Sequence, residues 1–523
     1  MLSWKQFLIS LTGSKVENLS NVHMIQKILI ANRGEIAVRI INACREMSIP
    51  SVAVFSTVDR NSLHVQKADE AYCIGNPPPL ESYLNIGKII QVTKKSGADA
   101  IHPGYGFLAE NPEFCERCEK EGIIFIGPNS KALRLVGDKV ESRKTMTEAK
   151  IPIIPGMMSS GKQTKGFKEA AEKIGYPVMI KASAGGGGKG MRVAWSPEEL
   201  EKGVEAGMRE AKSAFGDESV YLERCIEEPR HVEFQVLADN FGHVIHLCER
   251  ECSIQRRHQK IVEETPSCAL DEKLRAKMGE VAKKVIEVSG YNNAGTVEFL
   301  LDKNKDFYFL EVNARLQVEH PITELVTGVD LVRQQIRIAS GEKLTFTQND
   351  IQQRGHAIEC RIYAEDPENN FFPSSGKILF MKEPSGPGIR HDCGIYSGCE
   401  VSVYYDPILS KVITWAETRE DARKRMLLAL SNYTVLGIKT SIGFLAAVME
   451  HPEFIAGNTQ TSFIDKNMSD WKGKRKERRF VNEALIAAAI SSSTRPTSRK
   501  RLQGKQEMPS PWLTLGKWDL GGI

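Results

Sequence analysis

The sequence predicts a multidomain protein of mixed α/β and α+β class, and three observations lead to this prediction. The chain has 523 residues, which is enough for several packed domains. Residues 27–55 follow a strand–helix–strand pattern, which is typical of a parallel sheet. Residues 226–467 contain many stretches in which polar and apolar residues alternate, as they do in half-buried strands.

Composition excludes several broad classes of protein. The net charge of +4 is small for this length, so it favours neither a nucleic-acid-binding protein nor a membrane-surface protein. No apolar run is long enough to span a bilayer. The 11 cysteines form no dense framework, which suits a reducing compartment, and we expect a cytoplasmic location.

The N-terminal stretch, residues 1–23, carries a short apolar patch but no charged segment before it and no signal-cleavage site after it. We expect a disordered leader, or sequence upstream of a true start at Met24. A transit peptide is the weaker alternative.

The first structured unit is expected to have strands at 27–31 and 51–55 and a helix at 34–47. Its first turn, residues 32–34, has one glycine where a dinucleotide fingerprint needs three, so that kind of site is rejected. Residues 99–106 and 123–128 each run from a strand into a loop that contains glycine and proline. Ligands bind at such strand ends.

A glycine run at 185–190 lies between two expected strands, 176–182 and 191–195. No P-loop pattern fits it. Glycines here would let backbone N–H groups wrap a phosphate chain, with Lys181 and Lys189 supplying positive charge. A mobile hairpin of this kind suits a lid that closes over a nucleotide. The alternative is a flexible surface hairpin.

Residues 249–260 place Gln255, His258 and Lys260 in one charged, extended stretch. Contacts to phosphate and ribose are one interpretation, and a solvated charged strand is another. A zinc site is a third, although its spacing fits no common zinc pattern. Its ligands would be His246, Cys248, Cys252 and His258.

Polar and apolar residues alternate through Phe309–Pro321, which predicts an extended chain with five polar side chains on one face. These side chains are Glu311, Asn313, Arg315, Gln317 and Glu319. A second strand-like run, residues 296–301, precedes a turn-rich segment. A hairpin centred between Asn304 and Lys305 would place Glu298 directly opposite Glu311.

Like charges that face each other on a sheet repel, so the Glu298–Glu311 pair needs a proton or a cation. Mg²⁺ takes oxygen ligands, and Asn313 would add a third oxygen. Arg315 offers a planar fork for a carboxylate, carbonate or phosphate. Glu319 is free to act as a base. The alternative is an ordinary solvent-facing strand of an antiparallel sheet.

Two further features have plain structural interpretations when each is taken alone. Alternation over residues 356–362 puts Glu359 and Arg361 on one face, which by itself predicts an exposed strand with a weak ion pair. His231 could equally be a satisfied core histidine.

Five stretches together resemble biotin carboxylase, the ATP-grasp component of the biotin-dependent carboxylases. They are long, independent and in the order of the family, and the resemblance covers about residues 25–467. The stretches are Asn32–Ala37, His102–Asn111, Lys181–Met191, Gln255–Lys260 and Asn313–Pro321.

The resemblance implies three domains. A Rossmann-like N-terminal (pre-ATP-grasp) domain would occupy residues 24–137. An ATP-grasp domain would occupy 138–345, with its mobile lid at about 156–225. The C-terminal domain of a biotin carboxylase would occupy 346–467, and residues 468–523 would form an extension.

The resemblance also implies an ATP-dependent C–N ligase. ATP, bicarbonate and carrier-linked biotin would give carboxybiotin, ADP and phosphate by way of carboxyphosphate. The residue matching Glu319 takes the proton from bicarbonate, while residues matching Arg315, Gln317 and the Val318 backbone hold that anion. Arg361 matches the arginine that steadies charge on the biotin ureido oxygen, and Lys260 belongs with the catalytic residues.

Nucleotide and metal contacts follow from the same resemblance. It implies ATP contacts for Lys139, Lys181, Gly186, Gly187, Gly188, Glu223, Ile226, His231, Gln255 and His258. Glu298 and Glu311 match the metal-binding carboxylates, with Asn313 as a possible third ligand. We expect Mg²⁺ or Mn²⁺ there.

Two departures from the family bear on partners. The sequence contains no Met-Lys-Met triplet, the motif that carries biotin in this family. We therefore expect biotin to come on a separate biotin carrier protein or biotinylated subunit, with a carboxyltransferase subunit as a further partner. The resemblance implies a homodimer, and we expect no nucleic acid as a partner. The tail at 468–523 resembles the linker before a biotinyl domain, and we expect it to dock a partner. A solvated basic tail is the alternative.

Two rival functions stay open. One is another ATP-grasp carboxylate–amine ligase that uses the same phosphate chemistry on a different acceptor. The other is a non-catalytic nucleotide-binding subunit, which the complete set of candidate catalytic residues disfavours. The final carboxyl acceptor, an acyl-CoA or pyruvate, is not encoded in these motifs.

Overall fold

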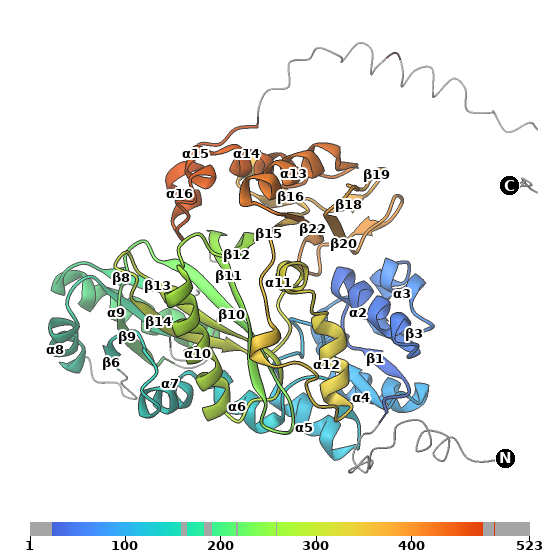
Figure 1. Cartoon of the computed structure of the whole chain (residues 1–523), viewed down its shortest axis with the longest axis horizontal. Helices are drawn as coiled ribbons and strands as arrows, with labels where there is room; N and C mark the ends of the chain where they lie inside the picture. The colour runs from blue at the N-terminus through green and yellow to red at the C-terminus, as the bar shows by residue number, and fades with distance from the viewer. Residues whose placement is uncertain are drawn as a thin grey trace, which may run out of the picture. The chain divides into compact units, whose positions relative to one another are not determined.

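A computed structural model describes residues 24–157, 165–182, 191–215, 218–257, 259–473 and 486. The leader expected over residues 1–23 lies outside these residues, and so does the tail beyond residue 473 apart from residue 486. Among the described residues, no helix is long and apolar enough to cross a membrane. Figure 1 shows the elements in chain order.

The chain begins with a five-stranded parallel sheet of order β3-β2-β1-β4-β5, as the strand–helix–strand pattern predicted. Strands β1 and β2 are buried along their whole length, as expected of a parallel sheet covered on both faces. The elements are β1 (Ile28–Ile30), α2 (Gly34–Glu46), β2 (Ser51–Ser56), η1 (Thr57–Asp59), α3 (Leu63–Lys67), β3 (Glu70–Gly75), η2 (Pro79–Glu81), α4 (Ile86–Ser96), β4 (Ala100–His102), α5 (Pro112–Lys120) and β5 (Ile124–Phe125).

Two short helices, α6 (Ser130–Gly137) and α7 (Lys139–Glu148), follow the first sheet. The break is at Asp138, whose side chain accepts hydrogen bonds from the backbone N–H groups of Val140 and Glu141. This cap satisfies donors that a helix start otherwise leaves unpaired. Lys139 is therefore the first residue of a helix.

A four-stranded sheet of order β6-β9-β7-β8 forms the segment expected to be a lid. It has its own apolar cluster, which includes Val178, Ile180, Leu200 and Leu222. Strands β7 and β8 pair antiparallel, so the predicted hairpin is confirmed, but the glycine run between them lies outside the described residues. The elements are β6 (Gly156–Met157), α8 (Lys165–Ile174), β7 (Val178–Ala182), β8 (Arg192–Ala194), α9 (Pro197–Phe215) and β9 (Val220–Arg224).

The largest sheet has eight strands in the order β14-β13-β10-β11-β12-β15-β22-β20, and α10 and α11 lie against it (Figure 1). Strand β11 is almost wholly buried, so the alternative of a solvated charged strand over residues 249–260 is wrong. That stretch is also not one extended segment, because the chain turns at Arg257. Elements up to residue 339 are β10 (Arg230–Ala238), β11 (Val244–Arg256), β12 (Gln259–Thr265), α10 (Glu272–Val288), β13 (Asn293–Leu301), β14 (Phe307–Asn313), α11 (His320–Thr327) and α12 (Leu331–Ala339).

The predicted hairpin is confirmed where the chemistry depends on it, because β13 and β14 place Glu298 directly opposite Glu311. A bulge at Leu310 shifts the register by one residue toward the turn. The strand ends at Asn313, so the expectation of one extended face reaching Glu319 is wrong. Residues 314–319 form a loop and turn that lead into α11, whose N-cap is Glu319.

The C-terminal part adds β15, β22 and β20 to the large sheet. Strand β15 is buried at every position, so the expectation of an exposed strand at 356–362 is wrong. The elements are η3 (Gln348–Asp350), β15 (His356–Tyr363), β16 (Glu365–Asp366), η4 (Pro367–Asn369), β17 (Phe372–Pro373), β18 (Gly376–Lys377), β19 (Phe380–Lys382), β20 (Ile389–Cys393), β21 (Glu400–Val401), β22 (Ile408–Ala416), α13 (Arg419–Asn432), β23 (Thr434–Leu436), α14 (Ile442–Glu450), α15 (Pro452–Ile455) and α16 (Phe463–Asn467).

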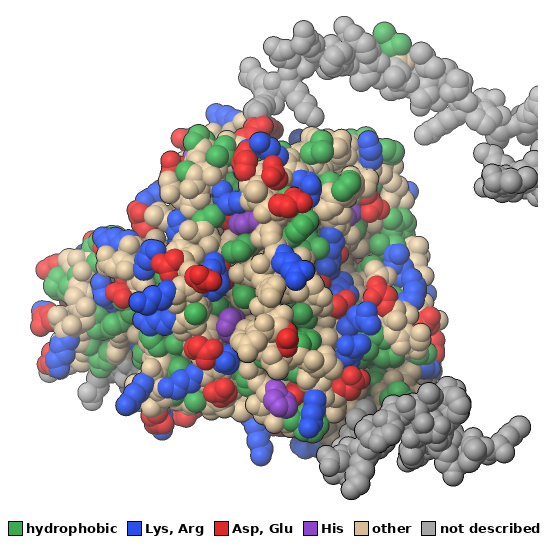
Figure 2. All heavy atoms as spheres, viewed as in Figure 1, with side chains coloured by type: hydrophobic (Ala, Val, Ile, Leu, Met, Phe, Trp, Pro, Cys, Tyr) green, Lys and Arg blue, Asp and Glu red, His purple; other side chains and the backbone are tan. Residues whose placement is uncertain are grey.

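Charged side chains of both signs are interspersed over the face of the molecule in Figure 2. This mixture agrees with the small net charge of the sequence. On this face, no large field of one sign points to a polyanionic partner.

Candidate active site

A cavity of about 1820 Å³ is lined by most of the residues that the sequence predicts to form the site. Ordinary ligand pockets measure about 300–1,000 Å³, so this cavity has room for more than one substrate. The predicted residues that line it are Lys139, Lys181, Glu223, Ile226, His231, Gln255, Lys260, Glu298, Glu311, Asn313, Arg315, Gln317, Val318 and Arg361. Gly186, Gly187, Gly188 and His258 lie outside the described residues.

Three glutamates lie side by side across neighbouring strands, and two of them, Glu298 and Glu311, line the cavity. Glu298 on β13 faces Glu311 on β14 and Glu233 on β10. Glu311 opens into the cavity, where loss of solvent raises the pKa of its carboxyl group and the charge of Glu298 raises it further. A divalent cation between these two carboxylates would relieve that repulsion.

The fit of a hard cation to this place is supported by the donor set, which consists of oxygen atoms. The third predicted ligand, Asn313, is buried, and its Oδ1 accepts a hydrogen bond of 3.0 Å from Arg315. That oxygen is therefore already engaged. Glu298 and Glu311 are the stronger candidates for holding the ion.

Lys260 is bound by three carboxylates. Its Nζ lies 2.5 Å from Glu233, 2.8 Å from Glu298 and 2.8 Å from Glu319. Burial alone would lower the pKa of Lys260, but these carboxylates raise it well above its ordinary value. Lys260 is therefore a fixed positive charge and not a base.

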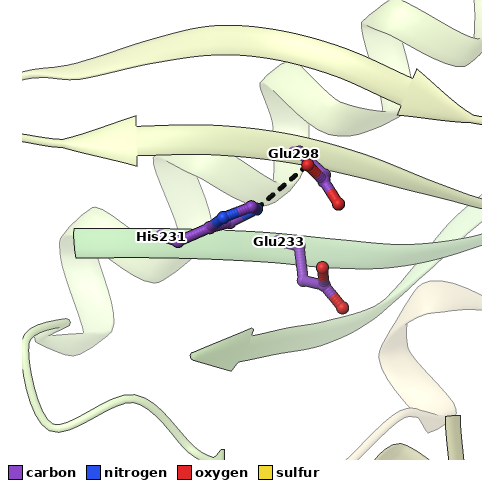
Figure 3. A group of neighbouring side chains, drawn as sticks. All are labelled: His231, Glu233 and Glu298. Atoms are coloured by element: carbon purple, nitrogen blue, oxygen red, sulfur yellow. Dashed lines mark ion pairs between the residues drawn. The ribbon is translucent and has the colours of Figure 1, made fainter. Parts of the chain in front are cut away.

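His231 also contacts this group, as Figure 3 shows: it reaches from β10 toward Glu298, with Glu233 farther along the same strand. Its Nε2 lies 3.0 Å from Glu298, and its Nδ1 lies 2.8 Å from the side-chain nitrogen of Gln255. His231 is buried but lines the cavity, so the core-histidine interpretation describes only part of its setting.

Two groups of side chains in the described part of the chain have the geometry to hold a metal ion: His231–Glu233–Glu298 and Glu233–Cys252–Glu319. Lys260 occupies the space between their carboxylates, and a second cation there would compete with it. Neither group contains His246 or Cys248, so the described residues give the zinc interpretation no support.

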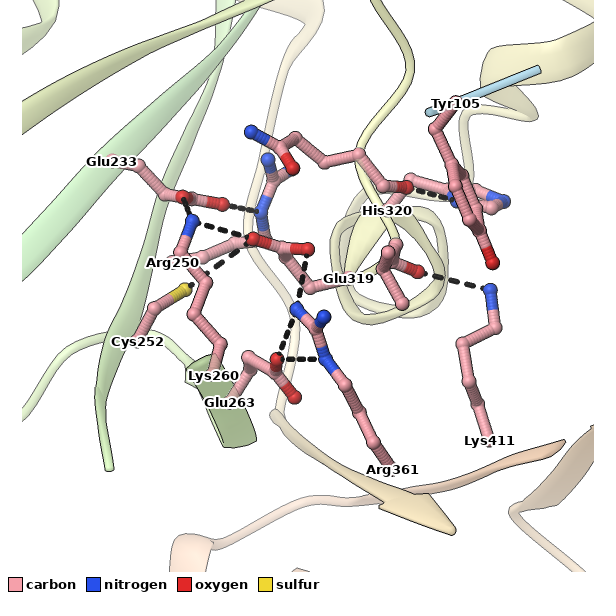
Figure 4. Close-up of polar contacts among 12 residues, drawn as sticks. Tyr105, Glu233, Arg250, Cys252, Lys260, Glu263, Glu319, His320, Arg361 and Lys411 are labelled. Carbon is pink, nitrogen blue, oxygen red and sulfur yellow. Dashed lines mark hydrogen bonds and ion pairs between the residues drawn. The ribbon is translucent and has the colours of Figure 1, made fainter. Parts of the chain in front are cut away.

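Glu319 is fully buried beneath the cavity, between two cations. Figure 4 shows Lys260 and Arg361 approaching its carboxylate from two sides, each at 2.8 Å. Burial would raise the pKa of Glu319, but Lys260, Arg361 and Arg250 hold it well below its ordinary value. The side chain is therefore ionised and able to accept a proton.

Arg361 is held on its other side by Glu263 on β12, at 2.6 Å from Nε. With 7% of its surface exposed, Arg361 is not the weak surface ion pair that alternation alone predicted. It is the only described arginine that contacts Glu319 directly while also lining the cavity.

Arg315 presents a guanidinium group that three side chains hold in place. It donates hydrogen bonds to Glu110 at 2.8 Å, to Gln317 at 2.9 Å and to Asn313 at 3.0 Å. Because Arg315 and Gln317 lie in the loop after β14, they converge on the cavity although they are not on a common strand.

The turn before α11 is fixed from below by a buried lysine. Lys411 on β22 is fully buried and donates a hydrogen bond of 2.9 Å to the carbonyl oxygen of Val318. Lys411 also pairs with Glu35, at 3.2 Å, and with Asp392, at 3.8 Å. Glu35 also accepts a hydrogen bond from Tyr105, which lines the cavity.

Glu223, which lies near the end of β9 in the four-stranded sheet, binds two cations. Arg143 lies 2.5 Å from one carboxylate oxygen and Lys181 lies 2.6 Å from the other. Lys181 is therefore engaged by Glu223 in this structure. Ile226 and Lys139 also line the cavity.

Arg250 supports the floor of the site. It is fully buried and donates hydrogen bonds to Glu233, Gln235, Thr296 and Thr323. We expect Arg250→Met to lower the free energy of unfolding by about 3–5 kcal/mol, because it leaves the buried Glu233 charge poorly compensated. Urea unfolding followed by circular dichroism measures this.

The exposed Arg209 supplies the control, and Arg209→Met is expected to change the unfolding free energy by no more than about 0.5 kcal/mol. Equal unfolding midpoints for the two variants would contradict the role given to Arg250.

Several side chains of the site were not predicted from the sequence. Glu233 had a usable signal, since it lies two residues after His231 and so on the same face of a strand. Glu110 lies within a stretch that carried the family resemblance. Glu263 and Lys411 had no local signal, because their partners lie in distant parts of the sequence.

Comparison with known families gives three matches that together cover most of the chain. Residues 24–133 match "Biotin carboxylase, N-terminal domain", residues 138–347 match "Carbamoyl-phosphate synthase L chain, ATP binding domain", and residues 359–466 match "Biotin carboxylase C-terminal domain".

Individual proteins are similar over the same region. A pyruvate carboxylase subunit of Methanothermobacter thermautotrophicus is 54% identical over 443 residues, which are 85% of this chain and 90% of that one. Biotin carboxylase of Nostoc sp. is 54% identical over 440 residues, which are 84% and 98%. The biotin carboxylase domain dimer of Hydrogenobacter thermophilus 2-oxoglutarate carboxylase, solved with MgADP, ADP and bicarbonate, has a TM-score of 0.83 at 47% identity and covers 86% of this chain and 99% of that one.

Proposed function

The chain belongs to the biotin carboxylase family, and we propose that the cavity above Glu319 carries out the reaction of that family with the residues assigned below. In that reaction biotin is carboxylated with bicarbonate at the expense of ATP, and the products are carboxybiotin, ADP and phosphate. The observation that carries the residue assignment is the position of Glu319, ionised and held between Lys260 and Arg361 at the floor of a cavity large enough for two substrates.

Bicarbonate is bound by Arg315, Gln317 and the backbone of Val318. The three hydrogen bonds of Arg315 fix its guanidinium plane, so little conformational entropy is lost when it binds a planar anion. Glu319 removes the bicarbonate proton. The resulting oxyanion attacks the γ-phosphorus of ATP, ADP leaves, and carboxyphosphate forms.

The basicity of Glu319 depends on which cations hold it. With both Lys260 and Arg361 bound, the pKa of Glu319 is held well below its ordinary value, and a base so weak accepts a proton poorly. Both cations line the cavity, but Lys260 is also held by Glu233 and Glu298, so Arg361 is the partner that can move. When Arg361 turns to the ureido oxygen of biotin, Glu319 loses one stabilising charge and becomes a better base.

ATP is held by Lys139 and Lys181 at its phosphates and by Glu223 and Ile226 at the adenine end. The positive end of α7 adds to the charge of Lys139. When ATP binds, Lys181 must leave its ion pair with Glu223 and contact a phosphate instead. This change of partner suits a segment that moves as a lid. His231, Gln255 and His258 complete the contacts, together with Gly186, Gly187 and Gly188.

Glu298 and Glu311 would hold Mg²⁺ or Mn²⁺, and Asn313 would be a further oxygen ligand only by sharing the oxygen that accepts from Arg315. When bound, the ion neutralises charge on the phosphate chain. Lys260, which already contacts Glu298, extends this positive region toward Glu319.

Lys411 is expected to position the turn before α11, which contains Val318 and is proposed to bind bicarbonate. Lys411→Met removes the hydrogen bond to the Val318 carbonyl, so we expect the KM for bicarbonate to rise by about tenfold or more while the KM for MgATP changes little. Steady-state kinetics at varied bicarbonate measures this, with the exposed Lys439→Met as control. If stability falls but both KM values stay unchanged, Lys411 only supports the fold.

Biotin arrives on a carrier protein, and a carboxyltransferase subunit uses the product. The relative from Methanothermobacter is named as one subunit of a pyruvate carboxylase, which supports an assembly of several chains here. The dimer from Hydrogenobacter supports a homodimer, which sedimentation equilibrium would test.

The tail over residues 468–523 is a candidate docking segment for these partners. Its basic run and its tryptophans offer charge and apolar area to a partner protein. A chain truncated after residue 473 keeps Trp471, which packs on Phe444, and tests this directly. Unchanged co-purification with the carrier or transferase would exclude the docking role.

The proposed function is tested by ATP cleavage that requires bicarbonate, measured with and without free biotin. Strong stimulation by biotin supports the assignment. Stimulation by an amine in place of biotin would instead favour another ATP-grasp ligase. ATP binding without cleavage under either condition would indicate a non-catalytic subunit.

A further inference from the structure

Glu359 is a buried carboxyl group that the proposed mechanism does not use. It lies on β15 two residues before Arg361 and has no exposed surface. Neither of its carboxyl oxygens has a hydrogen-bond donor among the described residues. Polar atoms as deeply buried as these are rarely left without a partner.

Directly opposite Glu359 in the sheet lies Glu263 on β12. Its Oε1 accepts a hydrogen bond of 2.6 Å from Arg361, while its Oε2 is buried and also lacks a donor in the described structure. Side chains opposite each other on a sheet stand about 4.5–5.5 Å apart at Cβ, which puts the two carboxyl groups within reach.

The two cations near this pair of glutamates form their hydrogen bonds and ion pairs mainly with other groups. Arg361, on the same strand, binds Glu263 and Glu319. Lys411, on the neighbouring β22, binds the Val318 carbonyl and Glu35. Glu319, at the start of α11, adds a further negative charge. Glu359 therefore lies opposite one carboxylate and within the electrostatic influence of a second, and no described cation forms an ion pair or hydrogen bond with it.

Two adjacent carboxylates in a dry interior cannot both stay charged without a counter-ion. A single proton removes the repulsion and provides an O–H donor for the orphaned oxygen of Glu263. Burial raises the pKa of Glu359 well above its ordinary range, and Glu263 and Glu319 raise it further against the opposing effect of Lys411 and Arg361. Burial also raises the pKa of Glu263, to about 7, although Arg361 opposes this.

We propose that Glu359 is a neutral carboxylic acid that donates a hydrogen bond to Glu263 and thereby positions Arg361 for the carboxylation of biotin. Glu263 is then satisfied at both oxygens, and its carboxylate plane is fixed against the Arg361 guanidinium. Glu359 is a positioning residue, since it touches no substrate. The inference rests on the proposed role of Arg361 toward biotin.

Infrared difference spectroscopy of the full chain, wild type against Glu359→Gln, tests the protonation state without depending on activity. At neutral pH we expect a C=O stretching band of a protonated carboxyl group in the wild type, shifted in D₂O and lost in the variant. Absence of this band would mean that Glu359 is ionised, and would overturn the proposal even if the enzyme carboxylates biotin.

Kinetics of two variants test the positioning role. Glu359→Gln keeps a neutral donor and is expected to retain the biotin-stimulated rate within about threefold. Glu359→Leu has similar volume but no donor, and we expect that rate to fall by about tenfold or more, while ATP cleavage in the absence of biotin keeps its KM for MgATP. A Gln variant as impaired as the Leu variant would contradict the proposal. If the Leu variant does not fold, the spectrum and the Gln variant still decide.

Discussion

Replacing Glu319 with glutamine is expected to lower kcat for bicarbonate-dependent ATP cleavage by about 10²–10⁴-fold, which is the usual contribution of a general base. The amide keeps the size of the side chain but cannot take a proton. Phosphate release assays at saturating MgATP and bicarbonate measure the change, with and without biotin.

Binding of MgATP should survive this substitution, because none of the residues proposed to contact the nucleotide is altered. Calorimetric titration of MgATP into Glu319→Gln checks that point. The surface variant Glu417→Gln serves as the control for loss of one negative charge. Retention of most of the wild-type kcat by Glu319→Gln would remove Glu319 from its role as base.

The second large effect is expected at the facing carboxylates. We expect Glu311→Gln to lower kcat/KM for MgATP at fixed Mg²⁺ by about 100-fold, because a catalytic ion contributes several kcal/mol and here loses a charged ligand. Glu311 is a cleaner test than Glu298, which also binds Lys260 and His231. Activity measured over a range of Mg²⁺ concentrations gives the result.

Excess Mg²⁺ should partly restore the activity of Glu311→Gln. The variant binds the ion more weakly because it has lost one charged ligand, and a higher Mg²⁺ concentration raises the occupancy of the site. Without the ion, the same variant should be no less stable than the wild type, because it removes repulsion from Glu298. An unchanged Mg²⁺ dependence would place the ion elsewhere.

Sequence patterns predicted the local structure well where the contacts are between segments that are close in the sequence. Alternation and a turn-rich segment were enough to pair Glu298 with Glu311, and a strand–helix–strand pattern located the first sheet. The bulge at Leu310 and the end of the strand at Asn313 were missed, because a period of two continues through a loop as readily as through a strand.

Burial of charged strands was the main error. Strands β11 and β15 carry several charges, and alternation alone describes such strands as solvent-exposed. Their charges are satisfied across the sheet, as in the contact between Arg361 and Glu263, and such partners come from distant parts of the sequence. The roles of the site residues came from the family resemblance, and they stay predictions until they are tested.

The most direct test follows the oxygen atoms of bicarbonate. If the oxyanion formed by Glu319 attacks the γ-phosphorus, the bridging oxygen of carboxyphosphate comes from bicarbonate and remains on phosphorus when the C–O bond breaks. With ¹⁸O-labelled bicarbonate in unlabelled water, mass spectrometry of the released phosphate should therefore show one heavy oxygen per molecule. Unlabelled phosphate, released at a rate that still depends on bicarbonate, would show that water attacks the nucleotide and that the assigned chemistry is wrong.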